Sequence, residues 1–133
     1  SFVMGALSRI PAPHGIEAMQ AINVVVINRS FFLAFFGTSA LCVALLVAAW
    51  LWWNAPAGKL LLLGSVIYLA GTIGVTMAFN VPLNNALAAA QPATPQAATL
   101  WAHYLERWTM WNTVRTVAPT VAMALFMAAL ICR

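Results

Sequence analysis

Residues 60–79 read LLLLGSVIYLAGTIGVTMAF, an uninterrupted run of 20 uncharged and mostly apolar residues. A helix of about 20 apolar residues is long enough to cross the ~30 Å hydrocarbon core of a bilayer. Two further runs contain no charge, 23 residues at 31–53 and 17 residues at 116–132. The 133-residue chain is 64% apolar and 6% charged, with a mean hydropathy of +0.92, which lies outside the range of soluble domains. The sequence therefore predicts an integral membrane protein whose first partner is the lipid bilayer.

We predict an all-α membrane protein, a single up-down transmembrane helix bundle of four spans within residues 1–133. The opening SFVMGAL reads as the end of a first span that is truncated in this chain. Two long connections emerge on one membrane face, and residues 15–27 of the first connection form an interfacial helix. The predicted spans are residues 1–7 (the end of the first span), 31–53, 60–80, and 99–132 as a long helix that includes the fourth span.

The charge pattern indicates orientation in a membrane and excludes a nucleic-acid surface. Six basic and two acidic residues give a formal charge of +4, but the basic residues form no cluster. Under the positive-inside rule, their distribution would place the face with the long connections in the cytoplasm, but a functional role for Arg115 would remove one charge from that count and leave the orientation open. Cys42 and Cys132 form no disulfide framework, and we expect both to be small packing residues.

Three carboxamides follow the run at 60–79, in the segment NVPLNN at 80–85. A carboxamide in hydrocarbon costs free energy unless its donors and acceptor find partners. Pro82 also removes a backbone donor from the same turn. Thr72 and Thr76 precede Asn80 at intervals of four residues and extend the polar row into the span. The alternative for the two threonine hydroxyls, and the one we favour, is a hydrogen bond to a backbone carbonyl one turn earlier. This pattern predicts one wall of a polar cavity.

Two local patterns predict helix packing and a helix start. Ala70, Gly74 and Ala78 form a small-residue stripe of the kind that lets membrane helices approach closely. Thr94 and Pro95 suit the N-cap and the first position of the next helix.

The most regular pattern lies in the last long helix, where five side chains fall within an arc of about 80° on a helical wheel. Aromatic side chains also suit an interfacial belt, which is the alternative for Trp101. A belt does not account for Asn112 and Arg115, because a charge inside a membrane is by default a functional-site hypothesis. Snorkelling to the interface is the alternative for Arg115. The five residues are Trp101, Tyr104, Trp108, Asn112 and Arg115.

Two amides in the first connection, Gln20 and Asn23, are three residues apart and share a helix face. The sequence leaves two orientations open for them, towards lipid headgroups or towards the polar cavity.

Three ordered motifs resemble the anthrone-oxygenase-like family of small four-span membrane proteins, whose bacterial members are mostly uncharacterised. The motifs are MQxxN at 19–23, TxxFNVPLN at 76–84 and WxxYxxxWxxxNxxR at 101–115. The family's characterised fungal members oxidise the activated methylene of a polyketide anthrone to a quinone with molecular oxygen, without metal or flavin. The resemblance implies a cofactor-free oxygenase of the bacterial inner membrane that acts on a flat aromatic or quinone-like molecule.

Such chemistry requires removal of a proton from an acidic C–H, stabilisation of the resulting anion, and exclusion of water. By resemblance, Arg115 would stabilise the anion, three amides would donate to its oxygen, and aromatic side chains would stack on the ring. The base stays unassigned between His14 and His103. The implied catalytic residues are Arg115, Asn112, Asn80 and Asn84, and the implied substrate-binding residues are Trp108, Tyr104, Trp101, Asn23 and Gln20.

Other functions stay open at the level of sequence. The pairs His14-x-x-Glu17 and His103-x-x-Glu106 would suit a transition metal, but their order is the reverse of di-iron bundles, and we assign no metal ligand. A non-catalytic subunit would instead pack on a larger membrane complex or on a second copy. A transporter is less expected, because four spans without a repeat are few for alternating access. An enzyme would have its polar residues lining an empty pocket. In a subunit, the same residues would satisfy one another's hydrogen bonds.

Overall fold

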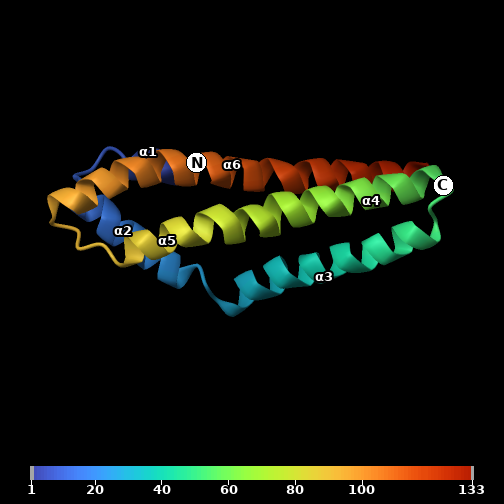
Figure 1. The fold of residues 1–133 in the computed structure, drawn as a ribbon, viewed down its shortest axis with the longest axis horizontal. Coiled ribbons are helices and arrows are strands. Elements are labelled where there is room, and N and C mark those ends of the chain that lie inside the picture. Colours follow the sequence, from blue (N-terminus) through green and yellow to red (C-terminus); the bar gives the residue numbers. More distant parts are fainter. Residues whose placement is uncertain (1, 133) are drawn as a thin grey trace. The chain divides into compact units, whose positions relative to one another are not determined.

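The computed structural model describes residues 2–132, and within that range every element is helical (Figure 1). The apolar and Pro-punctuated sequence is divided into α-helices and two adjacent π-helices. The elements are α1 (Phe2–Leu7), α2 (Ala12–Val25), α3 (Arg29–Leu51), α4 (Pro56–Tyr68), η1 (Leu69–Gly74), η2 (Thr76–Asn80), α5 (Val81–Ala88) and α6 (Pro95–Ile131).

Within residues 2–132, three helices are long and apolar enough to cross a membrane, which confirms the helical membrane fold. They are Arg29–Leu51, the continuous stretch Pro56–Ala88, and Pro95–Ile131. Of the predicted first span, the described residues contain only the six-residue α1. The prediction of four spans is therefore confirmed for three of them, and the first span stays a prediction. The last helix begins at Pro95, four residues before the predicted start, because the Thr94 hydroxyl accepts a hydrogen bond of 3.2 Å from the Ala97 N–H. This confirms the N-cap predicted at Thr94.

Contacts along the chain separate into two compact units. The first, which we call the head unit, contains residues up to Asn28 together with Thr76–Thr113. The second, which we call the span unit, contains Arg29–Val75 and the residues from Val114 onward. The long helix α6 contributes its first half to the head unit and its second half to the span unit.

Close helix packing in the span unit depends on glycines other than the predicted one. A Cβ atom at Gly71 would overlap the Ala118 Cβ, and one at Gly64 would lie 2.6 Å from the Phe126 ring. At Gly74, the nearest atom would be the Leu69 carbonyl oxygen at 3.8 Å. The predicted stripe through Gly74 was therefore wrong as the packing surface. Its four-residue spacing did not allow for η1, whose π-turns are wider than α-turns and rotate the following residues.

The rest of the span unit is a helical hairpin with a small core. Helices α3 and α4 pack side by side (Figure 1), and Cys42, Tyr68 and Ala122 are buried where these helices meet α6. Within the candidate span of α3, 6% of the residues are buried. A helix that is apolar on all sides and yet exposed is suited to contact with lipid.

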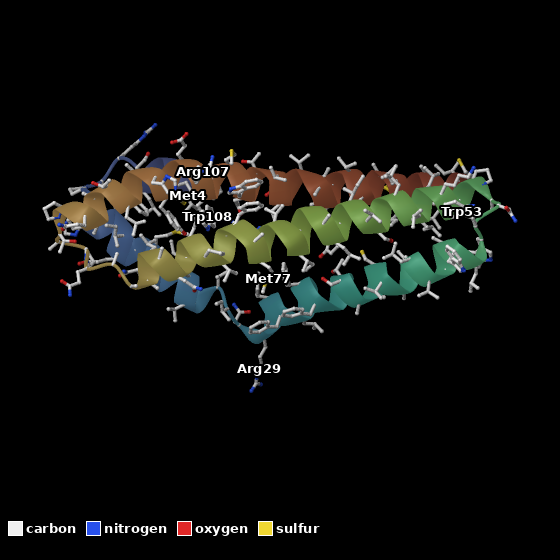
Figure 2. The ribbon with its side chains drawn as sticks, viewed as in Figure 1. Met4, Arg29, Trp53, Met77, Arg107 and Trp108 are labelled. Carbon is white, nitrogen blue, oxygen red and sulfur yellow. The ribbon has the colours of Figure 1, made fainter. Side chains whose placement is uncertain are left out.

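The head unit has a larger core, in which α2 lies against α5 (Figure 1). Helix α2 occupies Ala12–Val25, close to the predicted interfacial helix at 15–27, and begins after Pro11. A Cβ atom at Gly15 would lie 2.8 Å from the Trp101 ring, so the absence of a side chain there lets α2 approach α6. Core residues come from four helices, and Trp108 packs against them (Figure 2). They are Met4, Leu7, Ile16, Met19, Leu87, Ala97, Trp101 and Tyr104.

Candidate functional site

A chain of side-chain hydrogen bonds crosses the head unit and joins three helices. The Tyr104 hydroxyl on α6 donates to Asn84 Oδ1 on α5 at 2.8 Å. The same hydroxyl accepts from Asn23 Nδ2 on α2 at 3.5 Å. Tyr104 is fully buried, with 0% of its surface exposed, so these bonds satisfy a phenol that would otherwise be costly to bury.

Gln20 closes the end of α5. Its Nε2 donates to the Leu87 carbonyl at 2.8 Å and to the Ala90 carbonyl at 3.1 Å. The last carbonyls of a helix have no partners within the helix, and a side-chain amide can supply them. Both donors of Gln20 are thus used in tying α2 to α5, and its orientation is inward instead of towards headgroups.

Three aromatic rings stack along the inner face of α6. Trp101 and Tyr104 have ring centroids 5.6 Å apart with an interplanar angle of 14°. Tyr104 and Trp108 are 6.0 Å apart at 19°. Trp101 is 4% exposed, so it is a core residue of the head unit, and the alternative of an interfacial belt does not describe it.

The η2–α5 segment runs antiparallel to α6, and two contacts fix their register. Asn84 bonds to Tyr104, and earlier in the segment the Phe79 ring stacks on Trp111, with centroids 3.7 Å apart and an angle of 5°. The sequence pattern did not predict this stack, because neither ring continues the predicted polar row. Asn80 precedes Asn84 by four residues, and Trp108 follows Tyr104 by four residues. Both lie one helical turn from the Asn84–Tyr104 bond, towards the Phe79–Trp111 stack.

Asn80 and Trp108 both have buried polar atoms without partners. Asn80 is 1% exposed, and neither its Nδ2 nor its Oδ1 makes a hydrogen bond within residues 2–132. The buried Trp108 Nε1 is also without a partner in that range. Buried polar atoms of this kind are rare and need an explanation, such as a catalytic role or a bound polar molecule. Two donor atoms, Asn80 Nδ2 and Trp108 Nε1, and one acceptor, Asn80 Oδ1, therefore lie one turn along the η2–α5 segment and α6 from the Asn84–Tyr104 bond.

The backbone at Asn80 is also unusual, since Asn80 ends the π-helix η2. Pro82 follows in the first turn of α5, where it lacks an N–H and its ring crowds the carbonyl four residues earlier. Single π-turns occur often at functional sites. The sequence signal for this feature was the Asn-Val-Pro order, which predicted a lost donor but not a wider turn.

The remaining predicted site residues are distributed over both units. Asn112 is half-buried and belongs to the head unit, whereas Arg115 is half-buried in the span unit. Of the two candidate bases, His14 is exposed and lies 3.7 Å from Glu17, and His103 is exposed on α6. In the described part of the chain, no three His, Cys, Asp or Glu side chains come together as a metal site.

The apolar helices and the buried amide and aromatic cluster define a helical integral membrane protein with a polar site in its head unit. Residues 31–125 match the model of the anthrone oxygenase family, and the chain belongs to that family. No curated protein and no solved structure matches the chain.

Proposed function

We propose that this protein oxygenates an activated aromatic, polyketide-like substrate in the head unit without metal or flavin. One observation carries the proposal, the buried polar atoms of Asn80 and Trp108 that have no partner within residues 2–132. A fold that needed these residues only for packing would have a lower free energy with apolar side chains at both positions. Their polar atoms therefore point to a bound oxygen-bearing molecule.

The reaction for which the pair is suited converts an activated methylene to a carbonyl. The substrate loses a proton to form an enolate-like anion, and the anion then passes an electron to molecular oxygen. In the balanced reaction the methylene and one O₂ give one carbonyl and one water. Asn80 Nδ2 and Trp108 Nε1 would donate to the enolate oxygen, where negative charge develops. Asn80 Oδ1 would accept from a neighbouring hydroxyl of the ring.

The other predicted residues have two kinds of role in this proposal. Tyr104, Asn84, Asn23 and Gln20 bond one another or the backbone and hold the helices around the site. Arg115 would compensate the charge of the anion, as the family motif implies, with Asn112 as a further donor. The proposed location is the inner membrane of a bacterium.

The saturated bonds of Tyr104 and Gln20 also favour an alternative function. Side chains that satisfy one another in this way are typical of internal polar packing, as in a non-catalytic subunit of a larger membrane complex. In that case the cluster would only hold α2, α5 and α6 together. Asn80 separates the two functions, because a packing role leaves its unpartnered carboxamide unexplained.

The test is oxygen uptake by the purified protein in lipid nanodiscs with a hydroxylated anthrone, measured together with the absorbance of the quinone. Empty nanodiscs give the rate of spontaneous oxidation. Asn80→Leu should lower the protein-dependent rate by roughly a hundredfold, the usual cost of losing one oxyanion donor. Trp108→Phe should act in the same direction. The matched control is Asn85→Leu, an exposed amide in the same segment 80–85, which should retain the rate.

Two results would contradict the proposal. One is a wild-type rate equal to that of empty nanodiscs with several hydroxylated anthrones. The other is an Asn80→Leu variant as active as the wild type.

A further inference from the structure

A pocket on the outside of the head unit contains none of the predicted catalytic or substrate-binding residues, although the candidate base His103 lines it. It has a volume of about 260 Å³ and lies between the η2–α5 segment and α6. An arginine and a histidine form one part of its wall, and aromatic or apolar residues form the remainder. The wall includes Phe79, Pro82, Leu83, His103, Arg107 and Trp111.

Arg107 is a cation without a counter-ion in the described chain. It is exposed on α6, next to the inward-facing Trp108 (Figure 2). The whole sequence contains two carboxylates, Glu17 and Glu106. Glu17 lies 3.7 Å from His14, and among residues 2–132 no acidic side chain forms an ion pair with Arg107. A guanidinium is always charged in proteins, so the pocket presents a fixed positive charge.

The apolar part of the wall is flat and lies at a defined level of the chain. Phe79 and Trp111 stack with centroids 3.7 Å apart, which presents an aromatic surface beside the cation. Phe79 is the last residue of the mostly apolar run 60–79, directly before the amides of segment 80–85. A tryptophan at such a boundary is typical of the interface between hydrocarbon and headgroups. The pocket therefore lies where a lipid headgroup would meet the protein.

We propose that this pocket binds the phosphate headgroup of an acidic phospholipid. The planar guanidinium of Arg107 suits a phosphate because it can donate two parallel hydrogen bonds. His103 lies one turn away on the same helix face and adds a second donor. The glycerol and the first acyl carbons would lie on Phe79 and Trp111. Basic pockets between membrane helices bind anionic headgroups for these reasons.

The recognised chemistry is a phosphate anion, which a lipid or free phosphate could supply, and the experiment separates these sources. Protein purified in a neutral detergent is titrated with phosphatidylglycerol, phosphatidylcholine or inorganic phosphate, and bound species are counted by native mass spectrometry. We expect phosphatidylglycerol to bind about tenfold more tightly than phosphatidylcholine. Inorganic phosphate at equal concentration should not compete, because it cannot use the aromatic surface.

Two variants and one control locate the binding. Arg107→Gln should weaken phosphatidylglycerol binding about tenfold, since hydrogen bonds to charged groups are the stronger ones. Ala78→Leu should also weaken it, by filling the pocket that Ala78 helps to line. Arg9→Gln removes another exposed cation of the head unit, outside this pocket, and should change nothing.

Three outcomes would overturn the proposal. They are equal binding of the two lipids, unchanged phosphatidylglycerol binding in Arg107→Gln, and competition by inorganic phosphate at the concentration at which the lipid binds. The last of these would assign the pocket to a free anion.

Discussion

The Tyr104 hydroxyl donates a 2.8 Å hydrogen bond to Asn84 Oδ1, and this bond fixes α5 against α6 within the head unit. One turn away along the same two helices, Asn80 and Trp108 have buried polar atoms without a partner in the described residues. Two neighbouring turns of the η2–α5 segment and α6 thus differ. At Asn84 and Tyr104 the polar side chains are hydrogen-bonded, whereas at Asn80 and Trp108 they have buried atoms without partners in the described residues. The hydrogen-bonded turn can hold the geometry of its neighbour, as supporting hydrogen bonds do around active sites.

Tyr104→Phe should destabilise the protein by about 0.5–2 kcal/mol, the range for an inter-helix hydrogen bond in a membrane protein or for a buried group left unpaired. The substitution removes the donor to Asn84 and the acceptor for Asn23 and leaves the ring in place. Unfolding in mixed micelles with increasing denaturing detergent measures the change.

Tyr68→Phe is the matched control for this substitution. Tyr68 is the other tyrosine of the chain and is 8% exposed in the span unit. Its hydroxyl makes no hydrogen bond within residues 2–132. Its loss should change the free energy of unfolding by less than about 0.5 kcal/mol. Equal effects of the two substitutions would mean that the Tyr104 bonds contribute nothing to stability.

Gly71→Ala should cost about 1–3 kcal/mol in the free energy of unfolding, because the new methyl group would overlap the Ala118 Cβ. Gly74→Ala should be neutral or slightly stabilising, since its Cβ would meet only a backbone oxygen at 3.8 Å. The two variants are compared by thermal unfolding in the same detergent. A larger cost at Gly74 would restore the packing stripe predicted from sequence.

Gly71 and Gly74 illustrate which features of the fold could be predicted from sequence and which could not. Charge-free length was enough to predict three membrane helices, because the bilayer thickness sets that length independently of the neighbours. The Thr94 cap could also be predicted, because it depends on adjacent residues alone. Helical spacing failed at Gly74, where π-turns change the phase within the helix.

The candidate site was predictable to a similar extent. Spacing placed Trp101, Tyr104 and Trp108 on one face of α6, and the structure stacks them in that order. Spacing could not show which amides would be satisfied. That outcome depends on contacts between segments far apart in the chain, such as Gln20 with Leu87.

If Arg115 compensates the anion as the family motif implies, Arg115→Ala should lower oxygenation of an anthrone by roughly a hundredfold or more while the protein stays folded. The measurement is the quinone rate in nanodiscs, with helix content checked by circular dichroism. Arg29→Ala removes an exposed arginine of the same unit (Figure 2) and should retain the rate. Retained activity in Arg115→Ala would remove Arg115 from the site.

Asn80→Leu should stabilise the protein, by about 1 kcal/mol or more, although it replaces a polar residue of the family motif. Leucine is close to asparagine in shape, and the substitution removes two buried polar atoms that have no partners in the described chain. The folded state then no longer bears the cost of desolvating them. Asn84→Leu makes the same chemical change one turn away but removes the acceptor of the Tyr104 bond, so it should destabilise the protein. Opposite signs for these two variants in the denaturing-detergent assay, with lost oxygenation in Asn80→Leu, would show that Asn80 is kept for function at a cost in stability. Destabilisation by Asn80→Leu equal to that by Asn84→Leu would instead mean that Asn80 is satisfied within the fold, and the assignment of the site to this level would fail.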